Sequence, residues 1–360
     1  MINLLKQWYE RYFTDPQTLI FGFILIVGVL LILVMNTHLM PILICIVIAY
    51  LFEGLVYRLN QIRVNRTIAA SIVTALILAS IFIVLFVLLP LLSRQVSELI
   101  LELPAMFGRG QQLLSQLPQQ YPEFVSTEQV EEVFAFVRTE LTHMGQRVVS
   151  LSLASVVGAI TFFVYLIILP LMVFFFLKDK DLILSWLGNF LPEERTLARK
   201  VWTDLDAKIS SYIRGKFIEV LVIWLTSFIA FAFMGLNYSM LLSMLVGLSV
   251  IIPYVGATVV TIPIAMIAFF QWGATSEFWY LMAIYAFIQF VDGNILVPLL
   301  FSEVVNLHPV AIIVAVVFFG SLWGIWGVFF AIPLATLIQA IIKAWPHHET
   351  QAEQESQGDN

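Results

Sequence analysis

An acid and an amide stand close together in an otherwise apolar stretch of the C-terminal third of the chain. Asp292 and Asn294 flank Gly293, and Gln289 lies three residues before the acid, on the same face of a helix. Hydrocarbon offers no water to solvate a carboxylate, so Asp292 must face a cavity, a bound ion or another helix. An acid buried there could bind a cation or exchange a proton near neutral pH. The alternative is that Asp292 lies at the membrane surface and caps a helix.

Two prolines predict interruptions in the helices that hold this acid. Carbonyls freed between Gly293 and Pro298 could coordinate a solute at the break of a discontinuous helix. Pro253 and Gly256 mark a second step, because proline lacks a backbone N–H and glycine permits unusual torsions. This step predicts either the tip of a re-entrant hairpin that faces the same cavity or an ordinary loop between two spans. Together with the acid and the two amides, these residues form the candidate transport path.

Three glycines near the C-terminal end predict close helix packing rather than a ligand site. Gly320 and Gly324 have the spacing of a small-residue packing motif, and Gly327 continues the series. The apolar run over residues 310–344 that contains them is too long for one ordinary helix. We therefore expect a tight bend or a close helix contact within this run.

Two further acids have basic neighbours in the sequence. Glu53 lies near Arg58 and Glu219 lies near Lys216, so we expect both acids to be paired at the membrane surface, with a transport role as the alternative. His308 stands beside a proline at an expected turn, and no second ligand follows it at metal-binding spacing. The sequence therefore predicts no metal site and no cofactor.

The composition places these residues in a membrane protein. Hydrophobic residues make up 61% of the 360 residues, charged residues make up 12%, and the mean hydropathy is +0.95. Soluble domains carry about 25% charged residues, so this chain cannot cover a globular surface. We expect an all-α polytopic protein of about 7–10 membrane segments, with re-entrant hairpins and one extramembrane helical insertion. The net charge of −6 argues against nucleic-acid binding, and the single Cys45 excludes an intramolecular disulfide.

The pattern of apolar and charged residues predicts six regions. In chain order they are N-terminal spans (1–92), an acidic extracytoplasmic helical element (93–148), a span (149–177), a basic cytoplasmic amphipathic helix (178–216), the transport core (217–345) and a disordered tail (346–360). Residues 217–342 contain neither Lys nor Arg. Basic loops favour the cytoplasmic side, and three loops agree on one orientation. We therefore expect a multi-pass protein of the bacterial inner membrane with both termini in the cytoplasm.

Motifs for enzyme chemistry are absent from the sequence. It contains no Walker loop, no dinucleotide-binding glycine fingerprint, and neither an HExxH nor a GxSxG motif. We therefore expect no enzyme, and any transport must be passive or driven by an ion gradient.

Several short segments together give a family resemblance over nearly the whole chain. They are Tyr212-Ile213-Arg214-Gly215, Ile252-Pro253-Tyr254-Val255-Gly256, Asp292-Gly293-Asn294 with Pro298, Asn306-Leu307-His308-Pro309, Gly324-Ile325-Trp326-Gly327 and Ala331-Ile332-Pro333-Leu334-Ala335. On these residues the chain resembles the autoinducer-2 exporter (AI-2E) family, and within it the PerM-type permease branch. The resemblance implies an integral inner-membrane transporter. Members of that family are linked to export of the signalling molecule autoinducer-2, and others to sodium/proton exchange.

One departure from the family pattern affects the substrate. Many members carry a Gly-Lys or Gly-Arg pair between the counterparts of Pro298 and Pro309, where this chain has Phe301-Ser302-Glu303. The missing cation argues against an anionic substrate. The leading hypothesis is therefore a permease or secondary transporter for a small solute, not driven by ATP. The alternatives are a sodium/proton antiporter and, from another class, a membrane scaffold that binds a partner through the acidic element.

The expected partners follow from these hypotheses. They are the lipid bilayer, a small solute or cation, and further copies of the chain in a homo-oligomer, because the glycine face and the amphipathic helices need packing partners.

Overall fold

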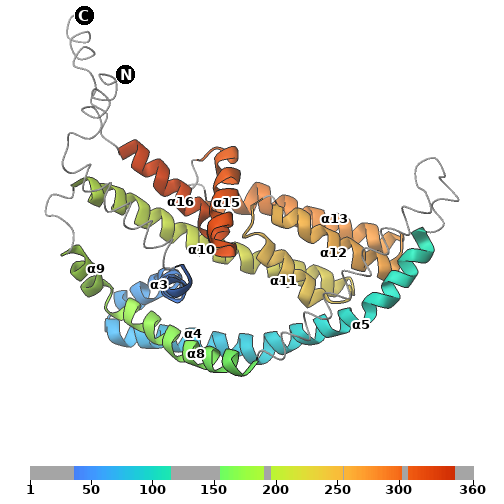
Figure 1. The fold of residues 1–360 in the computed structure, drawn as a ribbon, viewed down its shortest axis with the longest axis horizontal. Coiled ribbons are helices and arrows are strands. Elements are labelled where there is room, and N and C mark those ends of the chain that lie inside the picture. Colours follow the sequence, from blue (N-terminus) through green and yellow to red (C-terminus); the bar gives the residue numbers. More distant parts are fainter. Residues whose placement is uncertain (1–35, 115–154, 190–195, 254, 302–306, 345–360) are drawn as a thin grey trace, which may run out of the picture. The chain divides into compact units, whose positions relative to one another are not determined.

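The computed structural model describes residues 36–114, 155–189, 196–253, 255–301 and 307–344, and every element in these ranges is a helix (Figure 1). The chain divides into two compact units. The first unit comprises Met1–Thr67, Met172–Gly215 and Leu300–Asn360, and the second comprises Ile68–Leu171 and Lys216–Leu299. The protein is therefore an all-α membrane protein, as the composition predicts.

The first unit contains the first two residues of α4 (Arg66–Ile83) and the last two of α14 (Val297–Phe301), and most of its residues lie in six further described helices, of which α8 and α10 continue into the second unit. They are α3 (Asn36–Gln61), the end of α8 (Ser155–Lys178), α9 (Lys180–Gly188), the beginning of α10 (Thr196–Phe233), α15 (Pro309–Trp323) and α16 (Ile325–Ala344). Between α8 and α9 the chain bends by 78° at Asp179. The helices α15 and α16 pack against each other as a hairpin.

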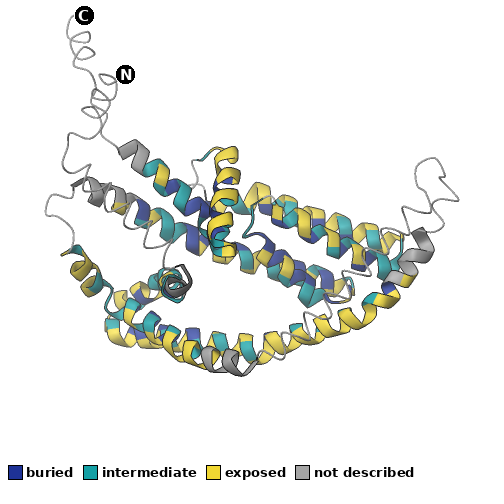
Figure 2. Ribbon diagram, in the orientation of Figure 1, coloured by how far each residue is buried: buried dark blue, intermediate teal, exposed yellow. Residues whose placement is uncertain are grey.

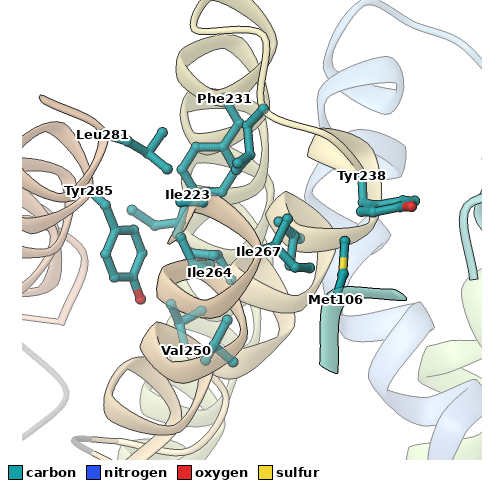
Figure 3. Close-up of a cluster of buried hydrophobic side chains, with 14 residues drawn as sticks. Met106, Ile223, Phe231, Tyr238, Val250, Ile264, Ile267, Leu281 and Tyr285 are labelled. Carbon is teal, nitrogen blue, oxygen red and sulfur yellow. The ribbon is translucent and has the colours of Figure 1, made fainter. Parts of the chain in front are cut away.

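The second unit holds most of the long apolar helices. Its described elements are α4 (Arg66–Ile83) from Ile68 onward, the π-helical turn η1 (Val84–Leu88), α5 (Leu89–Leu114), the remainder of α8 and of α10, α11 (Ser239–Ser249), α12 (Val255–Trp272), α13 (Ser276–Val291), a second π-helical turn η2 (Asp292–Leu296) and most of α14 (Val297–Phe301). The helix α12 packs against α11 on one side and α13 on another. Figure 3 shows the apolar core that this packing creates around Ile264, Phe231 and Leu281.

Five described helices are long and apolar enough to cross a membrane, or six if the bent pair α8 and α9 is one span. Many of their apolar side chains are exposed (Figure 2), including Phe233 at 87%, Leu101 at 80% and Leu299 at 73%. A soluble surface rarely carries so much exposed apolar area, whereas lipid tails solvate it. The first expected span near residues 18–35, the second helix of the acidic element, and the C-terminal tail lie outside the described residues.

Two long helices continue through positions at which the polarity of the sequence changes. The basic amphipathic segment and the span after it form one helix, α10, of 38 residues. Likewise, the third span continues through η1 into α5, so the first helix of the acidic element extends a membrane helix. In both places the change from polar to apolar sequence alters what surrounds the helix and leaves its hydrogen bonding intact. A change in polarity alone is therefore a poor predictor of a helix end.

Glycine makes the turn between α15 and α16 possible. Gly324 has φ 60° and ψ −137°, a conformation that a residue with a Cβ rarely adopts. A Cβ on Gly327 would collide with the carbonyl of Phe319, and one on Gly320 would lie 2.9 Å from Val328. The bend therefore depends on Gly324 as the turn residue, while Gly320 and Gly327 allow the two helices to approach closely.

Candidate functional site

Asp292 lies in the second unit, with only 8% of its surface exposed. It begins the π-helical turn η2, in which the N–H of Val297 donates to the carbonyl of Asp292. The helix is continuous over Ser276–Phe301, so the discontinuity expected near Pro298 is a widened turn rather than a break. Such turns occur at functional sites because they re-aim side chains without ending the helix.

A buried ion pair on α10 lies near this acid. The ammonium Nζ of Lys216 lies 2.7 Å from Oε2 of Glu219, one helical turn later, and the two side chains are 6% and 2% exposed. The charge of Lys216 also acts on Asp292, and that of Asp292 acts on Glu219, so the three groups are electrostatic neighbours. We call Lys216, Glu219 and Asp292 the buried charge cluster. All three residues belong to the second unit.

The ammonium also bonds to the end of a neighbouring helix. Lys216 Nζ donates to the carbonyl of Val250 over 2.9 Å, and Val250 is the C-cap residue that follows the end of α11. The last carbonyls of a helix have no partner within it and carry partial negative charge, so a cation there is favourable. The hairpin of α11 and α12 is thus joined at its turn to α10 by a buried cation.

The cluster contains two acids and one base. With all three groups ionised it would carry one excess negative charge in a place where water is scarce, which is costly without further compensation. Asp292 Oδ1 and the amide nitrogen Nε2 of Gln289 have no hydrogen-bond partner among the described residues. Buried polar atoms usually have such a partner, so an unpartnered acceptor and an unpartnered donor three residues apart on one helix are candidates for contacts with a ligand or ion. Chemically, this arrangement can hold a proton, a small cation or a hydroxyl-bearing solute.

The other predicted residues on this helix do not join the cluster. Gly293, Asn294 and Pro298 are exposed, and Asn294 Nδ2 donates to the carbonyl of Phe290 on its own helix. Asp292 is buried while its next two neighbours are exposed, so the amide of Asn294 belongs to a different face from the acid. The structure therefore retains Asp292 and Gln289 as site candidates and separates Asn294 from them.

The predicted step at Pro253 is the turn between α11 and α12. Pro253 is half-buried within this turn, and Gly256 is fully buried at the beginning of α12. A Cβ on Gly256 would collide with the carbonyl of Ser249, so only glycine lets the two helices meet so closely. These two residues position the hairpin turn whose Val250 carbonyl receives the lysine.

The remaining candidates have structural roles in the described part of the chain. Glu53 is paired, as expected, but with Arg66 and Lys180 rather than with Arg58. The Nδ1 atom of His308 accepts from the N–H of Val310 and caps the beginning of α15. Within the described residues no group of three His, Cys, Asp or Glu side chains could hold a metal ion.

Lys216 is the site residue that sequence reasoning did not include. The stretch without Lys or Arg begins at residue 217, one position after this lysine. The expected pairing of Glu219 with Lys216 is present, but within a span rather than at a solvated surface. The spacing of three residues on one helix predicts that contact. No local signal connects Lys216 with Val250, which lies 34 residues later.

Comparison with known proteins gives one family and several relatives. The model of the family described as "AI-2E family transporter" matches residues 21–347. A protein of Escherichia coli (strain K12) named "Putative permease PerM" is 46% identical over 346 residues, which cover 96% of this chain and 98% of the relative. A protein of Bacillus subtilis (strain 168) named "Putative transport protein YueF" is 27% identical over 314 residues, covering 85% of this chain and 83% of the relative.

Proposed function

This chain belongs to the AI-2E transporter family, and on that premise we propose that it is a secondary transporter that moves a small solute across the bacterial inner membrane without ATP. The family is one of transporters and permeases rather than enzymes. The observation that carries the proposal is the buried charge cluster in the second unit. A carboxylate, an amide and an ion pair are expensive to keep among membrane helices, and transport gives a reason to keep them.

Each residue of the proposed site has a distinct part in binding. The unpartnered Oδ1 of Asp292 accepts a hydrogen bond or a positive charge from the solute, and Nε2 of Gln289 donates to it. Lys216 and Glu219 hold the hairpin turn beside this pair. A solute with both donor and acceptor groups fits these atoms better than a simple anion, because the cluster has more acids than bases.

The test replaces Asp292 by asparagine, which keeps its size and removes its charge. Purified protein is reconstituted in liposomes, and flux is measured for labelled autoinducer-2, amino acids and polyols, with and without a pH or sodium gradient. We expect Asp292→Asn to reduce the flux of the transported solute by roughly tenfold or more, as lost charge-assisted contacts do. Glu277→Gln is the matched control, since Glu277 is an exposed acid in the first turn of the same helix. Equal flux in the wild type and in folded Asp292→Asn would remove Asp292 from the mechanism.

A second candidate function is sodium/proton exchange, favoured by the excess of one acid over the single base in the cluster. A carboxylate that binds sodium and a proton in turn is sufficient for such exchange. A sodium pulse applied to everted membrane vesicles should then release protons, detected by a pH-sensitive dye, and Asp292→Asn should abolish the signal. A pulse that moves no protons would reject this candidate.

The orientation of the chain is also part of the proposal. The basic loops place both termini in the cytoplasm, as the distribution of Lys and Arg favours. A reporter fused to the C-terminus that is active only in the cytoplasm, such as a fluorescent protein that does not fold after export, should be bright. A reporter active only outside would reverse the topology.

A further inference from the structure

The ammonium of Lys216 contacts two separate elements at once. It lies 2.7 Å from the carboxylate of Glu219 on its own helix and 2.9 Å from the Val250 carbonyl at the end of α11. Glu219 therefore fixes the lysine from one side, and the lysine fixes the turn of the α11–α12 hairpin from the other. Removing either charged side chain breaks the same connection.

Stability alone does not explain why a charged pair makes this connection. Taking two ions out of water is costly, and apolar replacements of similar volume are often neutral or stabilising. The neighbouring positions on α10 and α11 already use apolar packing. A Cβ on Gly247 of α11, for example, would lie 2.6 Å from Cβ of Trp224 on α10. What a charged pair adds is the ability to be released by a change of charge nearby.

Such a competing charge is present on a third helix. Asp292 at the start of η2 is buried like the pair, its charge acts on Lys216, and its Oδ1 has no hydrogen-bond partner among the described residues. The ammonium thus lies between an acid that holds it at the hairpin and an acid that draws it away. A proton, cation or solute bound at Asp292 changes this balance without touching the hairpin.

We propose that Lys216 is a latch that ties the turn of the α11–α12 hairpin to α10, and that a change of charge at Asp292 controls its release. In the latched state the Val250 carbonyl is bound to Lys216. In the released state the ammonium turns from Val250 toward Asp292, and the hairpin turn becomes free to move. Lys216 and Glu219 are positioning residues in this scheme. The purpose of the hairpin motion rests on the proposed transport function, whereas the latch itself does not.

The test measures motion of the hairpin turn directly, in the full-length chain in lipid nanodiscs. Hydrogen–deuterium exchange is followed for the peptide that covers the turn, where the N–H of Ile252 donates to Ser249 and that of Gly256 donates to Ile252. Lys216→Gln should speed exchange in this peptide by about tenfold. Lys216→Arg, which keeps a cation able to reach the same carbonyl, should restore exchange to within about twofold of the wild type.

The matched control removes a positive charge two residues away on the same helix. Arg214 is exposed and donates to the Ser210 carbonyl of its own helix, so Arg214→Gln should leave exchange at the turn unchanged. Glu219→Gln should speed exchange as Lys216→Gln does. The double variant should be no faster than either single variant, because both break one connection. Asp292→Asn removes the competing acid and should leave the turn as slow as in the wild type, or slower.

Three results would overturn the latch. One is unchanged exchange at the turn in folded Lys216→Gln. Another is an equal acceleration in every helix of the second unit, which indicates general loosening. The third is an additive effect of the two substitutions. If Lys216→Gln does not fold, exchange at the turn is compared between Glu219→Gln, which should be fast, and Lys216→Arg, which should be slow.

The latch and the transport proposal can fail separately. Exchange is measured without any solute, so fast exchange in Lys216→Gln supports the latch even if no solute in the panel is transported. Conversely, solute flux that depends on Asp292, together with unchanged exchange at the turn, would keep transport and reject the latch.

Discussion

Each of the two units contains a cluster of charged side chains, and the two clusters differ in their access to solvent. In the first unit, Glu53 Oε1 lies 3.1 Å from Arg66 Nη2 and 3.5 Å from Lys180 Nζ, and the side chains of Glu53 and Arg66 are 22% and 28% exposed. In the second unit, Lys216 and Glu219 are 6% and 2% exposed. Water partly screens the charges of the first cluster. The charges of the second cluster are compensated only by one another and by the polar atoms around them.

The difference in burial matches a difference in what the clusters hold. The Nε atom of Arg66 donates to the carbonyls of Leu177 and Lys178, both over 3.1 Å, and so caps the end of α8 where the chain bends toward α9. Its role is to fix a bend. Lys216 also binds a carbonyl at a helix end, but it does so beside a second acid and away from solvent. One cluster stabilises a fixed shape at modest cost, and the other can change state.

The largest expected effect comes from leaving one buried charge alone. Glu219→Leu leaves the ammonium of Lys216 buried without its ion-pair partner, and breaking a buried pair in this way costs about 3–5 kcal/mol. The apparent free energy of unfolding in mixed detergent micelles should fall by that amount. A loss below about 1 kcal/mol would show that the lysine is not buried as the structure has it.

Replacing both members of the buried pair should recover most of that loss. Lys216→Met with Glu219→Leu fills a similar volume with apolar atoms, so the unfolding free energy should return to within about 1 kcal/mol of the wild type or exceed it. Solute flux, measured on the same preparation, should still be lost. Stable protein with normal flux would place the ion pair outside the mechanism.

In the half-exposed cluster a single substitution should cost less. Arg66→Gln removes an ion pair that water already screens and weakens the cap on α8, so the unfolding free energy should fall by about 1–2 kcal/mol. Flux should change by less than about twofold if that cluster is architectural. A loss of flux well beyond twofold in folded Arg66→Gln protein would indicate that the first unit takes a direct part in transport.

The smallest expected effect is the response to salt. Raising the salt concentration from 0.1 M to 1 M shortens the screening length from about 10 Å to about 3 Å. The coupling energy between Arg66 and Glu53, taken from a double-mutant cycle, should fall from about 0.5–1 kcal/mol toward zero. The coupling between Lys216 and Glu219 should change little, because ions do not enter their surroundings. Equal salt sensitivity of the two pairs would contradict the difference in burial.

The sequence alone predicts the class of fold and part of the site. Composition requires membrane helices, and an acid at position 292 within an apolar run must be sheltered, as the structure has it. The pairing of Glu219 with Lys216 follows from helical spacing. The contact of Lys216 with Val250 does not, because it depends on how a hairpin folds back against a helix far along the chain. The short spacing of Asp292 and Asn294 predicts one site for both, yet residues two apart on a helix point in different directions.

The π-helical turn at Asp292–Leu296 has a further consequence for the path of its helix. A turn of this kind contains one residue more than an α-helical turn, and each residue of an α-helix rotates the side-chain direction by about 100°. In an uninterrupted α-helix Leu299, seven residues after Asp292, would therefore point to the same side as the acid, because seven steps of about 100° make nearly two full turns. The π-helical turn takes up one residue, and so Leu299 can point outward, 73% exposed, while Asp292 points inward, 8% exposed.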